Sequence, residues 1–168
     1  MTNDVRLVSM LERAMNRAIE EAVAAAHDGN YPLGALVMDD RGDTVSVARS
    51  ELVKVYDPTA HPEIVAIRAA CAKRRSRYLE ECVLVTTMEP CPMCTSAAIW
   101  AKMAGVGYGT RQPTAIEWYQ SHNDETFTWR QISIRAADVA AAGNPVIYVV
   151  GGVLEAACND LLDLTPVQ

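Results

Sequence analysis

Apolar residues recur every three or four positions over the first stretch of the chain, which is the spacing of one face of an α-helix. The positions on this face are Val5, Val8, Leu11, Met15, Ala18, Ile19, Ala22 and Val23. Gly29 follows them and is a typical helix stop signal. The pattern therefore predicts an amphipathic helix from about Asp4 to His27.

Two short apolar runs come next, at residues 33–38 and 44–48. The segment between them is polar and contains Gly42, as expected for a tight turn. This part of the chain predicts two antiparallel strands that form a hairpin.

Helical and strand patterns then alternate to the end of the chain. The predicted helices cover residues 62–75, 91–103 and 153–162, and the predicted strands cover 82–87, 106–109 and 146–150. Residues 110–145 predict short helices without firm boundaries. This order favours a three-layer α-β-α sandwich, in which a mixed five-stranded sheet carries helices on both faces, and we expect one domain over residues 1–168.

The composition fits a globular chain with a substantial core. Half of the 168 residues are hydrophobic, and no uninterrupted apolar run approaches the 18 residues of a membrane span. The first 21 residues carry charge throughout and lack the apolar centre of a signal peptide. We therefore expect a cytoplasmic protein that does not associate with membranes.

The charge balance argues against nucleic acid as the main partner. Fifteen Lys and Arg against 21 Asp and Glu give a net charge of −6, whereas proteins that hold phosphates normally need a basic surface. A local basic run contains Lys73, Arg74, Arg75 and Arg77. We interpret this run as the solvated end of a helix.

Cysteine usage points to metal or redox chemistry. Five cysteines are an odd number, unlike a secreted disulfide framework. Cys91 and Cys94 have C-x-x-C spacing, whereas Cys71, Cys82 and Cys158 fall in apolar stretches and are expected to pack in the core.

His61 and Glu63 form a second cluster, thirty positions before the cysteine pair. Both clusters fall at the predicted starts of helices that should lie against the same sheet. One imidazole and two thiolates, from His61, Cys91 and Cys94, predict one zinc ion per chain with an open fourth position, as in catalytic rather than structural sites. The positive N-terminal ends of the helices should stabilise the thiolates.

Such a zinc ion can lower the pKa of a bound water from about 15.7 toward about 7, which makes a hydroxide nucleophile available. Hydroxide alone cannot expel an amine. Glu63 is placed to take a proton from the water and return it to a leaving group, so we predict that it is the catalytic acid and base.

Two other readings of these residues remain open. A C-x-x-C pair after a strand and at the start of a helix also suits a dithiol oxidoreductase, although that function leaves His61 and Glu63 unexplained. A structural zinc site would need a fourth ligand, for which Cys82 or Cys158 is available.

The H-x-E and P-C-x-x-C motifs together resemble the zinc-dependent cytidine deaminase-like superfamily. The segments DPTAHPEIVAIRAAC (residues 57–71) and TTMEPCPMCTSAAIWA (residues 86–101) are most similar to its bacterial guanine deaminase and tRNA adenosine deaminase branch. The resemblance implies a deaminase fold, zinc held by His61, Cys91 and Cys94, proton transfer by Glu63, and a homodimer.

Several positions depart from the family's usual residues at the expected substrate pocket. Pro62 replaces the usual Ala or Gly and removes a backbone N–H beside the zinc, and Ser50 stands where relatives commonly carry a substrate-binding Asn. Leu33, in the stretch PLGA that includes Ala35, occupies a position where relatives often have Phe or Val. We expect these four residues to line a modified pocket.

Further along the chain, Trp100 resembles an aromatic residue that guanine deaminases place near the base. Asp124 and Glu125 lie where the family varies most and could read an exocyclic amine. We include all three as candidate substrate contacts, and expect His122 to be a surface residue.

The acidic charge favours a small-molecule substrate, a free amino-substituted nucleobase or nucleoside, over a nucleic acid. Guanine or another aminopurine comes first, although the C-terminal aromatic segment with which guanine deaminases close their pocket is not recognisable. Cytosine, another aminopyrimidine or an aminotriazine is the main alternative, followed by adenosine in tRNA.

Overall fold

The computed structural model describes residues 2–122 and 131–165, and side-chain burial from residue 5 onward. The chain forms a five-stranded sheet in the order β2-β1-β3-β4-β5. Its strands are β1 (Gly34–Met38), β2 (Thr44–Arg49), β3 (Val83–Met88), β4 (Gly105–Thr110) and β5 (Tyr148–Gly151). β1 is antiparallel to β2 and β3, whereas β3, β4 and β5 are parallel, so the predicted mixed sheet is confirmed.

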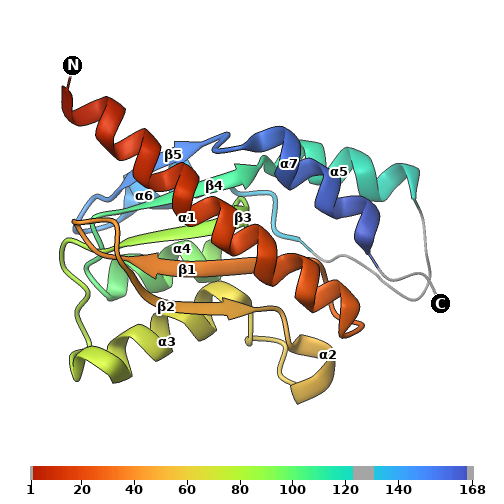
Figure 1. Ribbon diagram of the computed structural model, residues 1–168, viewed down its shortest axis with the longest axis horizontal. Helices are drawn as coiled ribbons and strands as arrows, with labels where there is room; N and C mark the ends of the chain where they lie inside the picture. Colours follow the sequence, from red (N-terminus) through yellow and green to blue (C-terminus); the bar gives the residue numbers. More distant parts are fainter. Residues whose placement is uncertain (1, 123–130, 166–168) are drawn as a thin grey trace.

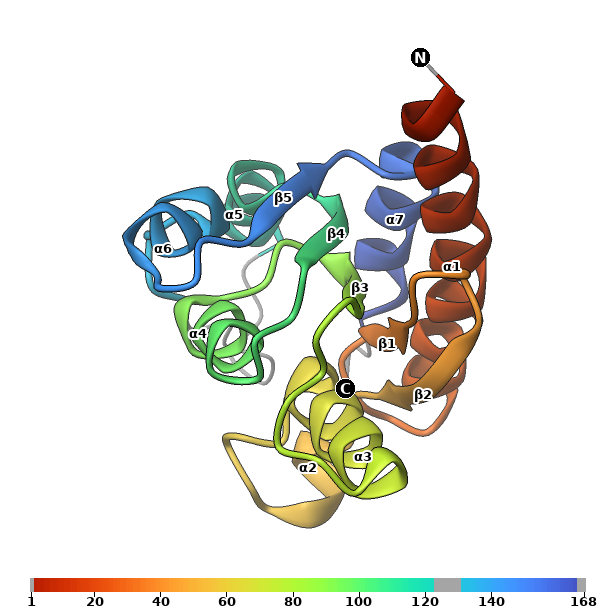
Figure 2. The ribbon, with the colours of Figure 1, turned by 90° about the vertical axis from the view of Figure 1, so that its left-hand side faces the viewer.

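Helices cover both faces of this sheet. α1 (Thr2–His27) and α7 (Glu155–Asp160) lie on one face, and α3 (Pro62–Arg74), α4 (Pro92–Trp100) and α6 (Ala136–Ala142) lie on the other, as Figures 1 and 2 show. α2 (Leu52–Val55) and α5 (Gln112–Ser121) lie near one end of the strands, and a 3-10 helix at Leu161–Leu164 follows α7. The three-layer α/β/α sandwich predicted from the order of patterns is confirmed.

Successive side chains of a buried strand point to opposite faces of the sheet, and they form a hydrophobic core on each face. In β1, Ala35 and Val37 face the α3 side, whereas Leu36 and Met38 face α1, and all four are fully buried. Gly34 permits a close backbone contact, because a Cβ at this position would lie 2.0 Å from the carbonyl oxygen of Ala18 in α1. The first helix therefore packs directly on the sheet.

Some helices differ from the predicted ones in their bounds, and one helix was not predicted. The helix predicted over 91–103 ends at Trp100, because the chain turns through Lys102, which has a positive φ of 54°, to begin β4. α2 had no predicted counterpart, and it buries none of its residues. Of the cysteines predicted to be core, Cys82 and Cys158 are buried and Cys71 is half-buried.

Within the described residues, none of the helices is both long and apolar enough to cross a membrane.

Candidate metal centre and pocket

The two predicted chemical clusters meet at one edge of the sheet. β3 and β4 are parallel and end at this edge, where β3 leads into α4, and the antiparallel β1 begins there. His61 is the residue that precedes α3 and Cys91 the one that precedes α4, and each helix has proline at its first position. Proline suits that position because the first helical N–H has no partner within the helix.

The three candidate ligands have the spacing of a tetrahedral zinc site. The Sγ atoms of Cys91 and Cys94 lie 3.6 Å apart, and His61 Nδ1 lies 3.8 Å from the first sulfur and 3.6 Å from the second. Zinc with Zn–S of about 2.3 Å and Zn–N of about 2.0–2.1 Å places tetrahedral S–S pairs about 3.8 Å apart and S–N pairs about 3.5–3.6 Å apart. The geometry therefore fits the ion, and these residues could hold it.

In the described part of the chain, this is the one group of three or more His, Cys, Asp or Glu whose donor atoms lie within 4.8 Å of one another. Cys82 and Cys158 do not join it. A structural site with a fourth cysteine ligand thus receives no support from the geometry.

The ligand residues already favour one thiolate. The hydrogen bond between the Cys91 and Cys94 sulfurs, together with His61, lowers the Cys91 pKa to about 4 despite partial burial. The same contact and burial raise the Cys94 pKa. The hydrogen bond with Cys91 also raises the His61 pKa. A cation that replaced the shared proton would hold both sulfurs as thiolates.

Glu63 lies next to the ligands on the first turn of α3, where it is buried. Thr86 Oγ1 donates to its Oε1 at 2.8 Å, and its Oε2 lies 3.6 Å from Cys94 Sγ. Burial raises the Glu63 pKa, and the charge of His61 and the Thr86 hydrogen bond oppose this only partly. A raised pKa makes this carboxyl group a better proton acceptor than an ordinary carboxylate.

A cavity of about 360 Å³ opens onto this cluster. His61, Glu63 and Cys91 form one side of it, and Leu33 is among the mainly apolar residues of its wall, with Tyr31, Leu52, Val53, Pro58 and Met88. The other lining residues are Glu89, then Gln112, Ala115 and Tyr119 of α5, and Gln131 and Ile132 before α6. We call this second group, apart from Glu89, the far wall.

The structure does not bring every predicted substrate residue to the cavity. Ala35 is fully buried in β1 among core residues, and Pro62 is buried at the start of α3 between two residues that do line the cavity. Trp100 is 82% exposed. It lies eight residues beyond Pro92 on α4, about 12 Å farther along the helix, so the structure does not place this aromatic ring at the pocket.

Ser50 is not among the residues that line the cavity, but it is hydrogen-bonded to Leu33, which is. Its side chain is fully buried, and its N–H donates to the carbonyl oxygen of Leu33 at 2.9 Å. Among the described residues, its Oγ has no hydrogen-bond partner. Asp124 and Glu125 lie outside the described residues.

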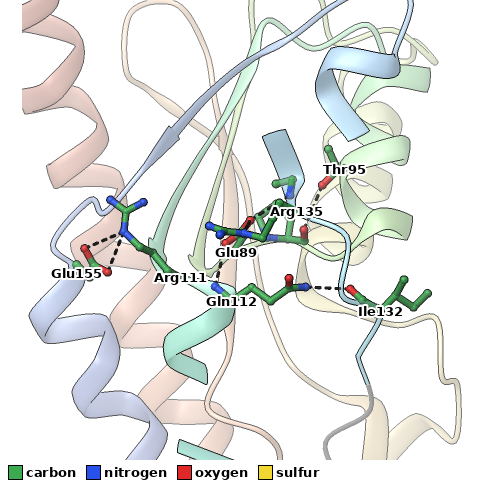
Figure 3. A network of polar contacts seen from close by, with 9 residues as sticks. Glu89, Thr95, Arg111, Gln112, Ile132, Arg135 and Glu155 are labelled. Carbon is green, nitrogen blue, oxygen red and sulfur yellow. Dashed lines mark hydrogen bonds and ion pairs between the residues drawn. The ribbon is translucent and has the colours of Figure 1, made fainter. Parts of the chain in front are cut away.

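Sequence reasoning missed the far wall and Glu89. The far wall follows β4 in a region whose sequence has no clear period, so nothing marked its residues. Glu89 carried a signal, because a charged residue stands between a buried strand and the C-x-x-C helix. Its side chain is 1% exposed and is hydrogen-bonded to three groups that lie 23 to 47 residues away (Figure 3).

Comparisons with known proteins agree with this geometry. The sequence family described as the cytidine and deoxycytidylate deaminase zinc-binding region matches residues 8–110. Guanine deaminase of Bacillus subtilis is 36% identical over 124 residues, which cover 74% of this chain and 75% of that protein. The tRNA-specific adenosine deaminase of Aquifex aeolicus is 38% identical over 89 residues, or 53% of this chain and 58% of the other.

A third relative is much longer. The tRNA(Ile)-lysidine synthase of Deinococcus radiodurans is 39% identical over 105 residues, which are 62% of this chain but 18% of that protein. The chain thus matches less than a fifth of its length.

Solved structures share the fold. Guanine deaminase from Nitrosomonas europaea superposes with a TM-score of 0.76 at 24% identity, covering 90% of this chain and 82% of that one. A protein in complex with 8-azaguanine gives a TM-score of 0.75 at 26% identity, covering 91% and 82%. A structure from a study of tRNA:A34 deaminases gives 0.67 at 26% identity, covering 89% and 99%.

Proposed function

The chain belongs to the cytidine and deoxycytidylate deaminase zinc-binding family, and on that basis we propose that it is a zinc-dependent hydrolytic deaminase of a free amino-substituted nucleobase or nucleoside. The reaction replaces an exocyclic amine by a carbonyl and releases ammonia. Guanine or another aminopurine is the favoured substrate.

One observation carries the proposal. A set of two sulfurs and one imidazole nitrogen with tetrahedral zinc spacing lies beside a buried carboxylate, and His61, Cys91 and Glu63 of this group border one cavity. A three-ligand site leaves a fourth position for water, which is the arrangement of catalytic zinc sites. A dithiol oxidoreductase would need the cysteine pair but neither His61 nor Glu63.

In the proposed mechanism His61, Cys91 and Cys94 would hold zinc, which would supply a hydroxide nucleophile at neutral pH. Glu63 would take up the proton that the attacking water loses and pass it to a ring nitrogen. It would then pass a second proton, from the hydroxyl group added to the ring carbon, to the amine, which leaves as ammonia while the carbonyl forms. The Thr86 hydroxyl holds Oε1 of this carboxylate in place, so that its Oε2 stays on the side of the metal ligands.

The cavity wall supports a flat, uncharged substrate. Most of its described residues are apolar or aromatic, which suits the faces of a heterocyclic ring. None of the described residues that line it is Lys or Arg, so none offers a cation to a phosphate group. This favours a base or nucleoside over a nucleotide.

The position of the basic run also supports a small substrate. Lys73 and Arg74 end α3, whose first residue is next to His61, and 12 steps of 1.5 Å separate the helix ends by about 18 Å. The run therefore lies at the far end of α3 from the cavity. Adenosine in tRNA stays the alternative that the tRNA-specific relatives raise.

The preference for a purine rests on similarity. Guanine deaminase of Bacillus subtilis covers three quarters of this chain, and one structural neighbour binds 8-azaguanine. Within the cavity, the proposed contacts are Leu33 on the ring face and Ser50 through a small rearrangement of the wall. Ala35, Pro62, Trp100, Asp124 and Glu125 stay predictions from the sequence.

The homodimer and the cytoplasmic location also stay predictions. Sedimentation of the zinc-loaded protein at micromolar concentration tests the dimer, and a monomer would contradict it.

Ammonia release by the zinc-loaded protein tests the function. The panel is guanine, guanosine, adenine, cytosine, cytidine, an aminotriazine and a tRNA anticodon stem-loop, each with wild type and Glu63→Ala. We expect turnover of a purine base or nucleoside and none by the variant. Turnover of the stem-loop alone would favour the tRNA alternative. Reduction of a disulfide substrate by metal-free protein, without ammonia release from any compound, would favour the oxidoreductase.

A further inference from the structure

Glu89 joins the metal-binding turn to the two segments that carry the far wall of the cavity. Its Oε1 accepts hydrogen bonds from Arg135 Nε at 2.7 Å and from the N–H of Ala136 at 3.0 Å, and its Oε2 accepts one from the N–H of Gln112 at 2.9 Å (Figure 3). All three donors belong to the chain beyond β4. One buried carboxylate thus connects three segments that are distant in sequence.

Two of these donors are helix starts that have no cap of their own. Gln112 is the first residue of α5 and Ala136 the first of α6, and the residues before them, Arg111 and Arg135, make no side-chain capping hydrogen bond. The first N–H groups of a helix have no partner inside the helix and favour a negative charge. Glu89 supplies that charge to both helices from a third segment.

On its other side, Glu89 is tied to the metal ligands. It stands two residues before Cys91, and its own N–H donates to the carbonyl oxygen of Thr110 at 2.8 Å. Thr95 Oγ1 donates to the carbonyl oxygen of Pro90 at 3.2 Å, which fixes the turn that follows. A shift of the Glu89 carboxylate would therefore change the distance between the turn that carries the metal ligands and the segments to which Glu89 is hydrogen-bonded.

The segments to which Glu89 is hydrogen-bonded carry the far wall. Gln112, Ala115 and Tyr119 are in α5, which begins at the Glu89 contact. Gln131 and Ile132 lead into α6, which begins at the second contact, and the Gln112 side chain donates to the carbonyl oxygen of Ile132 at 2.9 Å. Both parts of the far wall are thus connected to the metal side through the same carboxylate.

We propose that Glu89 is a positioning residue for the deamination reaction, which sets the distance between the far wall and the metal ligands and so holds the substrate ring over Glu63. The proposal rests on the proposed function. It assigns Glu89 no contact with the reacting atoms.

The test is Glu89→Gln, which preserves side-chain size. Whichever way the amide is turned, its NH2 group faces an N–H donor, and the charge that pairs with Arg135 is lost. We expect the substrate KM to rise about 10- to 100-fold while kcat changes less than about threefold, because a displaced wall weakens binding of the ring. Zinc content should stay at one per chain.

Glu155→Gln is the matched control. Glu155 also pairs with an arginine that precedes a helix, since Arg111 Nε lies 3.1 Å from its Oε1, but this pair is partly exposed and does not line the cavity (Figure 3). The control should keep wild-type KM. Arg135→Gln, which leaves both backbone contacts of Glu89 in place, should raise KM less than Glu89→Gln does and covers the case in which that variant folds poorly.

Amide hydrogen exchange tests the role of Glu89 independently of whether the protein is a deaminase. Residues 111–121 and 135–142 should exchange faster in Glu89→Gln than in wild type or Glu155→Gln, at equal zinc content. Unchanged exchange, unchanged KM, or loss of zinc together with activity would overturn the positioning role. If the wild type deaminates no compound, the proposed function fails, and the exchange pattern still decides whether Glu89 holds the far wall.

Discussion

Two glutamates border the same cavity, and their surroundings differ in almost every respect. Glu63 has one hydroxyl donor, from Thr86, and lies among the metal ligands, and burial raises its pKa. Glu89 is also buried, which by itself would raise its pKa, but the hydrogen bonds from Arg135 and two backbone N–H groups outweigh burial and lower it. Burial alone therefore does not decide what a carboxylate does; the number and charge of its donors do.

The two glutamates are therefore suited to different roles, Glu63 to proton transfer and Glu89 to holding the structure. A carboxylate with few donors keeps an oxygen available for a proton, whereas one that accepts three hydrogen bonds is fixed in its ionised form. The metal side of the cavity is thus suited to proton transfer, and the Glu89 side is suited to holding helices in place. The variants below break or sharpen this contrast, from the largest expected effect to the smallest.

Removal of a metal ligand should have the largest effect. We expect Cys94→Ala to lose zinc and all detectable ammonia release, because the remaining His61 and Cys91 leave too few ligands for a stable site. The sheet should persist, since its two cores do not depend on the metal. Metal analysis and far-UV circular dichroism check this. Cys158→Ala is the control, and loss of zinc from it would contradict the assigned ligand set.

Glu63→Gln should abolish turnover while zinc stays bound. Loss of a general acid and base costs about 10²- to 10⁴-fold in kcat, and the residue is not needed as a ligand. Stopped ammonia release with one zinc per chain is the expected result. A variant that loses its metal would show instead that Glu63 is required for zinc binding.

The same substitution at the two glutamates should change stability with opposite signs. In metal-free protein, Glu63→Gln should raise the free energy of unfolding by about 1–2 kcal/mol, because it removes a poorly compensated buried charge. Glu89→Gln should lower it by about 2–4 kcal/mol, because at least one backbone N–H donor, on Gln112 or Ala136, loses its acceptor and the charge that pairs with Arg135 is lost. Denaturant unfolding measures both, and changes of equal sign would remove the contrast.

The pH dependence of these differences follows from the pKa directions. Because the folded pKa of Glu89 lies below its ordinary value near 4.5, its stabilisation is complete above that pH and is lost as the pH falls through the lowered pKa. For Glu63 the folded pKa is raised, so its cost is fully present above that raised value, shrinks as the pH falls toward the ordinary pKa near 4.5, and is absent below it. The stability difference between wild type and Glu89→Gln should therefore shrink in acid.

Substitutions of Ser50 should have the smallest effect. Unlike the two glutamates, its buried hydroxyl has no hydrogen-bond partner among the described residues. If this hydroxyl reaches a bound substrate, Ser50→Ala should raise KM about tenfold with little loss of stability. Ser50→Asn should shift the substrate profile of the ammonia-release panel. An unchanged profile in Ser50→Asn would show that this position does not select the substrate.

Much of the fold could be predicted because its signals are local. The period of about 3.6 in α1, the apolar runs of β1 and β3, and the turn at Gly42 are each contained in a few residues. The candidate ligands were predictable for the same reason, since H-x-E and C-x-x-C place donors at the starts of two helices that the sheet brings together. In the structure the donor atoms of His61, Cys91 and Cys94 lie within 4.8 Å of one another.

What only the tertiary structure decided is the far wall of the cavity. The partners of Glu89 lie 23 to 47 residues further along the chain, in a stretch without a periodic pattern, and no local rule pairs them with it. Trp100 lies outside the described lining of the cavity for a related reason: its sequence distance from Cys94 is short, but the rise of α4 carries it away, and its role at the pocket stays a prediction from the sequence. The sequence by itself determined the elements and the metal chemistry, because these depend on spacing within a helix or strand. The shape of the pocket depends on which elements pack across the sheet edge.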